Sequence, residues 1–224
     1  MLLTIPGVIP RPQLERVRQL LQRGQFKDGK LSAGLEAQRV KHNQELVQEA
    51  DLYAALNNIV MGCLVKHPAY QRAALPRRIA APYYARYTAG MQYGNHIDDP
   101  IMGTGIDQYR SDVSTTVFLC DPANYEGGEL VICSTFGEQQ IKLPAGDAVI
   151  YPSSSLHHIN TVTRGERLVA VTWAQSLVRD PSQRELLYQL SQAREKMLSE
   201  HPDSEETAWV SNSYANLVRM WSDV

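Results

Sequence analysis

Residues 83–98 read YYARYTAGMQYGNHID, and this stretch sets the first expectations about the fold. Its first part, 83–88, is rich in the aromatic residues that favour β-strands. Gly90 follows as a turn signal, and the stretch ends with His96 and, two positions later, Asp98. Because side chains two residues apart in a strand share a face, this imidazole and this carboxylate can bind one ion from one side. Taken alone the pair is a weak signal, since a structural or surface histidine is the more common explanation.

Short runs of strand-forming residues continue beyond this stretch to about residue 178. Turn sequences separate them, as at 126–128 (EGG) and 144–147 (PAGD). Closely spaced short strands without amphipathic helices between them predict an antiparallel sandwich or barrel. The predicted strands are Tyr83–Thr88, Val113–Cys120, Glu129–Cys133, Gln139–Leu143, Asp147–Tyr151 and Leu168–Ala174.

Apolar residues at helical spacing lie on both sides of this β-rich part. Residues 11–66 are predicted to be mainly helical, with a polar, glycine-containing loop over 27–39, and residues 182–222 to return to helix. The short hinge at 180–182 argues for a docked tail rather than an independent domain. We therefore expect a mainly β fold with flanking helices (α+β). Its three parts would be an N-terminal helical region packed on the core (1–77), a β domain (78–178) and a C-terminal helical extension (179–224).

The composition is that of an ordinary soluble protein. Of 224 residues, 43% are hydrophobic and 21% charged, which argues against a disordered or fibrous chain. The formal net charge is −2 and no basic run is present, so nucleic acid is not an expected partner. No apolar stretch approaches the roughly 18 residues that cross a bilayer, and three scattered cysteines are too few for a disulfide framework. We expect a cytoplasmic protein with reduced thiols and no membrane partner.

Further candidate ligands lie near the end of the β-rich part. His157 and His158 are adjacent, and Arg167 comes ten residues after the first of them, at the start of an apolar strand. A buried arginine is costly unless it meets an anion, and its guanidinium group pairs well with a carboxylate. Two histidines and one carboxylate on one side of a metal are the ligand set of non-haem Fe(II) oxygenases, which leave positions open for a co-substrate and O₂. Either histidine could complete this set with His96 and Asp98.

Three motifs, in this order along the chain, resemble those of the prolyl and lysyl hydroxylase-like Fe(II)/2-oxoglutarate dioxygenases. The chain is most similar to the bacterial PKHD-type hydroxylases, small proteins with the same helical tail. The resemblance covers residues 78–178 by motif and the whole chain by length and layout. The motifs are Tyr87-x-x-Gly90-x-x-Tyr93-x-x-His96-x-Asp98, the strand pair 112–119 and 125–130, and His157 followed by Val162-Thr163-x-Gly165-x-Arg167.

The resemblance implies a double-stranded β-helix, or jelly-roll, core over 78–178. Its catalytic and metal-binding residues would be His96, Asp98 and His157, which would bind Fe(II). The ten-residue interval to Arg167 and the five-residue step to Val162 are what favour His157 over its neighbour in this comparison. Arg167 would bind the distal carboxylate of the co-substrate 2-oxoglutarate, and Tyr87 would add a hydroxyl group near it.

Other residues fit the resemblance less directly. Some relatives have a tyrosine that contacts 2-oxoglutarate where this chain has Phe118, so that second polar contact must come from another residue or be missing. His158 would face away from the metal. The loop 102–105, which follows the His-x-Asp pair, is expected to be either a lid over the substrate or a plain connection. The other histidines have no carboxylate partner at ligand spacing and are expected at the surface: His42, His67 and His201.

The activity that the resemblance implies is hydroxylation of an unactivated C–H bond, with release of succinate and CO₂. The substrate would be a peptide, an amino acid or a peptide-like metabolite such as a siderophore, and the motifs do not choose among these. L-Ascorbate would keep the iron reduced. The helical tail, with Trp209 and Trp221, could serve a homodimer.

Two alternatives to this activity stay open. A cupin-like metal enzyme that does not use 2-oxoglutarate would usually bring more histidines to its metal and would have no need of Arg167. A non-catalytic jelly-roll module for binding or sensing would not need a complete ligand set. The presence of all these residues together favours the dioxygenase.

Overall fold

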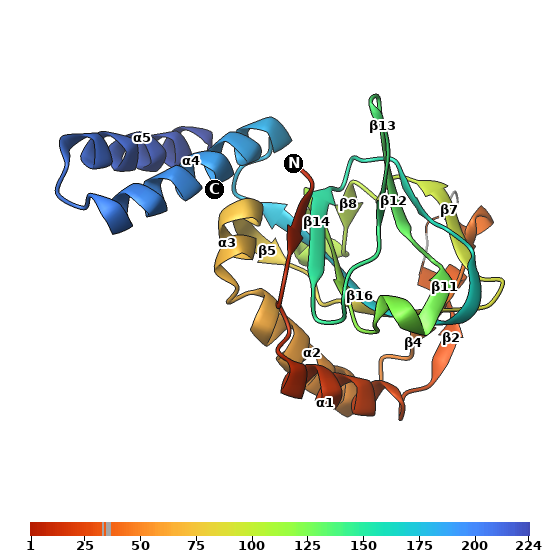
Figure 1. The fold of residues 1–224 in the computed structure, drawn as a ribbon. Helices are drawn as coiled ribbons and strands as arrows, with labels where there is room; N and C mark the ends of the chain where they lie inside the picture. Colours follow the sequence, from red (N-terminus) through yellow and green to blue (C-terminus); the bar gives the residue numbers. More distant parts are fainter. Residues whose placement is uncertain (33, 35–36) are drawn as a thin grey trace.

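Two antiparallel β-sheets face each other in the computed structural model, which describes residues 1–32, 34 and 37–224 (Figure 1). The strands of the larger sheet follow the order β1 (Leu3–Ile5), β14 (Ala148–Pro152), β10 (Val113–Phe118), β16 (Val162–Ser176), β6 (Tyr83–Thr88), β4 (Gln44–Leu46) and β2 (Phe26–Asp28). Two further strands, β5 (Pro76–Ile79) and β11 (Tyr125–Gly127), pair with the long strand β16 of this sheet. The smaller sheet consists of β13 (Gly137–Ile141), β12 (Leu130–Ser134), β15 (His157–Ile159), β7 (Gln92–His96) and β3 (Lys41–His42).

The α-helices lie outside the sheets. Each of the first two turns an apolar stripe inward: Leu14 and Val17 are buried on α1, and Leu56 and Val60 on α2. A left-handed residue, Leu75, ends the third helix and leads directly into β5. The helices are α1 (Arg11–Leu21), α2 (Ala50–Leu64), α3 (Pro68–Ala74), α4 (Pro181–Glu200) and α5 (Glu205–Trp221), with short 3₁₀ turns at 29–32, 37–39, 105–107 and 122–124. A small hairpin, β8 (Ile101–Met102) with β9 (Tyr109–Arg110), follows the His-x-Asp pair.

The larger sheet separates two hydrophobic cores. One core lies between this sheet and α1 to α3, and it includes Val117 and Ala170 from the sheet. The other lies between the two sheets, where Phe118 and Val169 meet Leu130 of β12. Because a strand alternates its faces, neighbouring residues of one strand serve different cores.

Strand β10 shows this division clearly, since all six of its side chains are buried. Val113 and Val117 belong to the core beneath the helices. Ser114, Thr116 and Phe118 alternate with them and face the space between the sheets. A strand that is buried on both faces therefore carries hydroxyl groups into the interior of the jelly roll.

The C-terminal extension is a pair of helices, α4 and α5, that projects from the body (Figure 1). The carboxylate of Asp180 caps α4 by accepting hydrogen bonds from the backbone N–H groups of Ser182 (2.7 Å) and Gln183 (3.0 Å). The chain end then returns to the body, where the N–H of Asp223 donates to the carbonyl of Leu177 (2.7 Å). The extension is therefore closed at its base.

Arg184 of α4 fastens this base to the jelly roll. Its side chain is 4% exposed and donates to the carbonyl oxygens of Val178 (2.8 Å), Arg179 (2.8 Å) and Asp112 (3.1 Å). The last of these carbonyls comes directly before β10. One guanidinium group thus connects the extension to the start of β10 in the larger sheet.

The expected mainly β fold with flanking helices is confirmed, and all six predicted strands are present. Strand β6 has the predicted bounds, and the other bounds differ by up to six residues, most at the start of β16. The prediction that 11–66 is mainly helical is incomplete, because β2, β3 and β4 lie between the two helices found there. These strands have two or three residues each and pair with distant partners, as β3 does with β7. Such short strands show no alternation of their own that a sequence pattern could reveal. The predicted loop 27–39 includes the end of β2, two 3₁₀ turns and residues 33, 35 and 36, which lie outside the described part.

Within the described residues, no helix combines the length and the apolar character that crossing a membrane requires.

Candidate metal and co-substrate site

Two adjacent strands of the smaller sheet bring the candidate metal ligands together. His96 is the last residue of β7, and His157, the first residue of β15, is its direct partner in the register. Asp98 follows β7 by two residues. His96, Asp98 and His157 each offer one ligand atom, and these atoms lie within 4.8 Å of one another. The arrangement has the donor set of a 2-His-1-carboxylate metal site.

Backbone carbonyls fix the orientation of both imidazoles. Nδ1 of His96 lies 2.8 Å from the carbonyl oxygen of Gly94, and Nδ1 of His157 lies 2.9 Å from that of Ser155. A carbonyl only accepts, so each Nδ1 carries a proton, which in a neutral imidazole leaves the lone pair on Nε2. Burial, and then the neighbouring His157, lower the pKa of His96, which favours the neutral form that binds metals.

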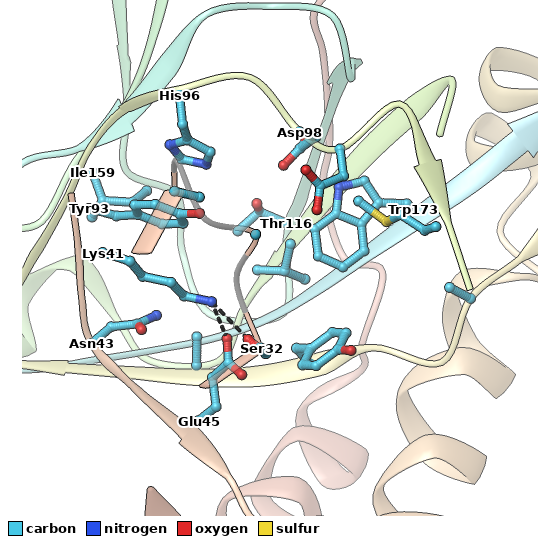
Figure 2. A pocket seen from close by; sticks show the side chains of 18 of the residues that line it. Ser32, Lys41, Asn43, Glu45, Tyr93, His96, Asp98, Thr116, Ile159 and Trp173 are labelled. Atoms are coloured by element: carbon cyan, nitrogen blue, oxygen red, sulfur yellow. Dashed lines mark hydrogen bonds and ion pairs between the residues drawn. The ribbon is translucent and has the colours of Figure 1, made fainter. Parts of the chain in front are cut away.

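Tyr93 supports His96 from the side. The two rings stack with centroids 3.6 Å apart and an angle of 11° between their planes. Figure 2 shows Tyr93 between His96 and the side chain of Lys41, whose ammonium nitrogen lies 5.4 Å from the phenol ring centroid. The imidazole is thus held by a hydrogen bond at its edge and by an aromatic ring on its face.

Arg167 is a buried cation without an anion. Its side chain is 1% exposed, and none of its three guanidinium nitrogens has a hydrogen-bond partner among the described residues. Tyr87, its partner in the register of β6 and β16, lies against it with the ring centroid 5.0 Å from the guanidinium carbon. An unpaired buried guanidinium is costly, so this position fits a carboxylate that arrives with a ligand.

A cavity of about 550 Å³ is lined both by the candidate metal ligands and by Arg167 with Tyr87. Arg167 lines it together with the three candidate ligands, so a single cavity gives access to both the metal position and the guanidinium group. Buried side chains such as Leu130 and Tyr151 line its inner part, as does Thr116 (Figure 2). Aromatic side chains that are partly exposed line the rest: Tyr53, Tyr83, Tyr109 and Trp173.

Phe118 and Tyr125 are two buried aromatic side chains of the core between the sheets, and both lie near Arg167. Phe118 is fully buried, with its ring centroid 5.7 Å from the guanidinium carbon of Arg167. The hydroxyl group of Tyr125 is buried and has no hydrogen-bond partner among the described residues. Burial raises the pKa of Tyr125 to about 12, although the nearby charge of Arg167 acts in the opposite direction. A neutral phenol donor therefore lies beside the guanidinium group.

The structure separates His158 from the site. Its Nε2 lies 3.1 Å from the side-chain oxygen of Asn160, and its Nδ1 lies 4.0 Å from the sulfur of Cys133. Adjacent residues of β15 point to opposite faces, so this ring lies on the outer side of the smaller sheet. His42 and His201 are exposed, whereas His67 is only partly exposed, and its Nδ1 is buried.

Two features of the site were not predicted from the sequence. Lys41 and Glu45 form an ion pair of 2.6 Å on the cavity wall, and the lysine also donates to Ser32 at 3.0 Å (Figure 2). Both partners are more than nine-tenths buried, and the sequence just after the predicted loop 27–39 does not indicate this. The second feature is Ser114, whose hydroxyl group donates to Asp98. The sequence contains no signal for this contact beyond the position of Ser114 in a predicted strand.

Fold and site together define an Fe(II)/2-oxoglutarate oxygenase. Residues 82–175 match the family model of the 2OG-Fe(II) oxygenase superfamily, and residues 182–223 match that of the PKHD-type hydroxylase C-terminal domain. Among solved structures, a Trichoplax adhaerens prolyl hydroxylase in complex with a peptide fragment is similar in fold (TM-score 0.57, 17% identity). That likeness covers 83% of this chain and 86% of the other.

The chain belongs to the family of PKHD-type hydroxylases. It is 54% identical to PKHD-type hydroxylase Tgr7_2199 of Thioalkalivibrio sulfidiphilus over 224 residues, which is 100% of both chains. It is 40% identical to PKHD-type hydroxylase YbiX of Escherichia coli over 225 residues, again over 100% of both. The chain is therefore an oxidoreductase, a 2-oxoglutarate-dependent hydroxylase with iron at its centre.

Proposed function

We propose that this hydroxylase inserts a hydroxyl group at an unactivated C–H bond of a peptide, an amino acid or a peptide-like metabolite such as a siderophore, and releases succinate and CO₂. The observation that carries the proposal is Arg167. A buried, unpartnered guanidinium group shares one cavity with a His-Asp-His cluster, which is what a dicarboxylate co-substrate of a metal enzyme requires.

Each residue of the site has a distinct part in this function. Fe(II), when bound by His96, Asp98 and His157, supplies activation of O₂ and, with 2-oxoglutarate, the oxidising power for C–H cleavage. The two imidazoles bind as neutral ligands through Nε2, and Asp98 offsets one unit of the metal charge. Arg167 orients the co-substrate by binding its distal carboxylate, while Tyr87 shields that ion pair from water.

The substrate is recognised in the outer part of the cavity. The aromatic rings there offer flat apolar faces, and the buried Lys41–Glu45 pair elsewhere on the cavity wall offers both a donor and an acceptor. A peptide-like substrate presents the same mixture of apolar surface and amide groups. Solved proteins of similar fold differ in what they hold, since HygX from Streptomyces hygroscopicus has hygromycin B bound. The outer wall, rather than the fold, therefore selects the substrate.

The test of the reaction class is an anaerobic titration of the Fe(II)-loaded protein with 2-oxoglutarate. We expect a visible metal-to-ligand charge-transfer band that saturates with one co-substrate per chain. A cupin-like enzyme that does not use 2-oxoglutarate would give no band. A binding or sensing module would give the band but no succinate when O₂ is admitted together with pools of peptides and amino acids.

The proposal also includes ascorbate as the reductant of the iron and the cytoplasm as the location of the protein. Ascorbate would sustain turnover by reducing iron that has been oxidised without substrate, so adding it should slow the loss of succinate formation over time. The cysteines Cys63, Cys120 and Cys133 are free, which is compatible with a reducing compartment. Fractionation of cells that express the chain would test this location. Sedimentation of the purified protein would test whether it forms a homodimer.

A further inference from the structure

The two carboxylate oxygens of Asp98 have different surroundings. Oδ1 lies 3.9 Å from Nε2 of His157, the nitrogen that would bind the metal, within the cluster of candidate ligand atoms. Oδ2 accepts a hydrogen bond from the hydroxyl group of Ser114 on β10. The carboxylate is therefore divided between the candidate metal position and the protein.

The hydroxyl group of Ser114 is itself fixed. It lies 2.8 Å from the hydroxyl oxygen of Ser153, and the two residues are 0% and 2% exposed. Since Ser114 has one hydroxyl proton and donates it to Asp98, Ser153 must be the donor in the contact between the two serines. The backbone N–H of Ser153 in turn donates to the carbonyl oxygen of Asp112 at 3.1 Å. Buried partners on two strands or their ends thus direct one hydroxyl proton toward Oδ2.

We propose that Ser114 is a positioning residue that keeps Asp98 a one-oxygen ligand. This inference rests on the proposed function, in which the metal needs open positions for 2-oxoglutarate and O₂. A carboxylate that bound through both oxygens would occupy one of these positions. Because Ser114 donates a hydrogen bond to Oδ2, only Oδ1 binds the metal, and the coordination position that Oδ2 would occupy stays open. Residues that support a ligand in this way commonly change affinity at the metal centre by roughly 10- to 100-fold.

The test compares the wild-type protein with Ser114→Ala, each loaded with Mn(II) in place of iron. Water-proton relaxation reports the number of metal-bound waters, and calorimetry reports the affinity of the loaded protein for 2-oxoglutarate. In Ser114→Ala we expect relaxivity per bound Mn(II) to fall by about one third, the share of one open position in three. We expect 2-oxoglutarate to bind about 10-fold more weakly although Arg167 is intact.

Two further variants separate positioning from packing. Ser114→Thr keeps the hydroxyl group and should return both values toward those of the wild type. Ser191→Ala is the matched control, because Ser191 is equally buried but lies on α4, where it donates to the carbonyl of Tyr188. If Ser114→Ala does not fold, Ser114→Cys replaces it, since cysteine keeps nearly the same volume and is only a weak donor.

The outcomes separate this inference from the proposed function. Wild-type relaxivity and wild-type 2-oxoglutarate affinity in Ser114→Ala would overturn the role of Ser114 alone. Weaker Mn(II) binding with unchanged relaxivity of the bound fraction would also overturn it, because Asp98 would still be a one-oxygen ligand. Failure of the wild-type protein to bind Mn(II) and 2-oxoglutarate together would instead reject the proposed function.

Discussion

Burial of Arg167 lowers the stability of the fold and at the same time favours binding of a carboxylate. Its buried guanidinium group has no hydrogen-bond partner among the described residues, so the protein without co-substrate contains an uncompensated charge. A carboxylate that binds here forms an ion pair with a guanidinium group that folding has already removed from water, so binding does not include that desolvation cost. The residue therefore favours co-substrate binding at the expense of stability.

We expect Arg167→Met to weaken 2-oxoglutarate binding to the Mn(II)-loaded protein at least about 30-fold, which corresponds to about 2 kcal/mol. Metal affinity should change little, and the free energy of unfolding of the metal-free protein should stay the same or rise. Calorimetry and urea unfolding provide the measurements. Arg164→Met, an exposed change on the same strand, is the control. Unchanged co-substrate affinity in Arg167→Met would show that the anchor lies elsewhere.

The adjacent histidines give a second prediction at the same scale. We expect His157→Ala to lose Mn(II) affinity by more than about 100-fold, beyond the effect typical of residues that only support a ligand. His158→Ala should bind Mn(II) as the wild type does, since its ring lies on the other face of β15. Equilibrium dialysis of both variants decides between them. Loss of metal in His158→Ala alone would reverse the assignment.

The site could be predicted from the sequence only where a pattern is local. The spacing of His96 and Asp98 suffices to place both on one face of an extended segment. Ser114, Lys41 and Glu45 act through burial and through contacts with distant strands. A sequence does not reveal such contacts, because the same residue types form an ion pair whether the pair is buried or exposed.

At the scale of elements, the attachment of α4 depends on Arg184. We expect Arg184→Leu to lower the free energy of unfolding by about 2–4 kcal/mol, because three carbonyl oxygens, two of them in buried hydrogen bonds, lose a charged donor. Urea unfolding followed by circular dichroism measures this change. Lys196→Ala is the control on the same helix, since its side chain is 73% exposed. Equal stability of the two variants would contradict the role of Arg184.

The start of α4 should respond to pH. Hydrogen bonds from the backbone N–H groups of Gln183 and Ser182 lower the pKa of Asp180 from 3.8. A carboxyl with a lowered pKa in the folded state stabilises the fold above its unfolded pKa, and this stabilisation is lost as pH falls through the folded value. We expect Asp180→Asn to reduce the dependence of Tm on pH below about pH 4. An identical acid profile in both proteins would exclude this cap as a source of that dependence.

The sequence predicts well those elements whose own residues show a pattern typical of a strand or a helix. Strand β6 is found at the predicted bounds, and α1 and α2 show apolar stripes at helical spacing. The short strands of the N-terminal region form only because β14, β6 and β7 offer them edges. Their existence is decided by tertiary pairing, which local propensity does not contain.

At the scale of the whole molecule, ligand binding should raise stability. With Mn(II) present and 2-oxoglutarate at 100 times its Kd, we expect a gain of about 2.7 kcal/mol. For a chain of this length the gain corresponds to a rise in Tm of about 5–10 °C. Differential scanning calorimetry measures it. Glutarate, which lacks the keto group, should give a smaller shift at the same concentration, and an equal shift would mean that the metal does not contribute to binding.

The two-sided burial of β10 has a consequence for how this protein can change. An insertion or deletion of one residue in β10 would exchange its faces and place hydroxyl groups under the helices and valines against Asp98. Such a change would remove the scaffold and the reaction centre together, so β10 should tolerate no change of length. The 99–110 segment, which follows Asp98 and contains the β8–β9 hairpin, lines the cavity from outside both sheets. Directed evolution toward new substrates should therefore accumulate length variants there and leave β10 untouched.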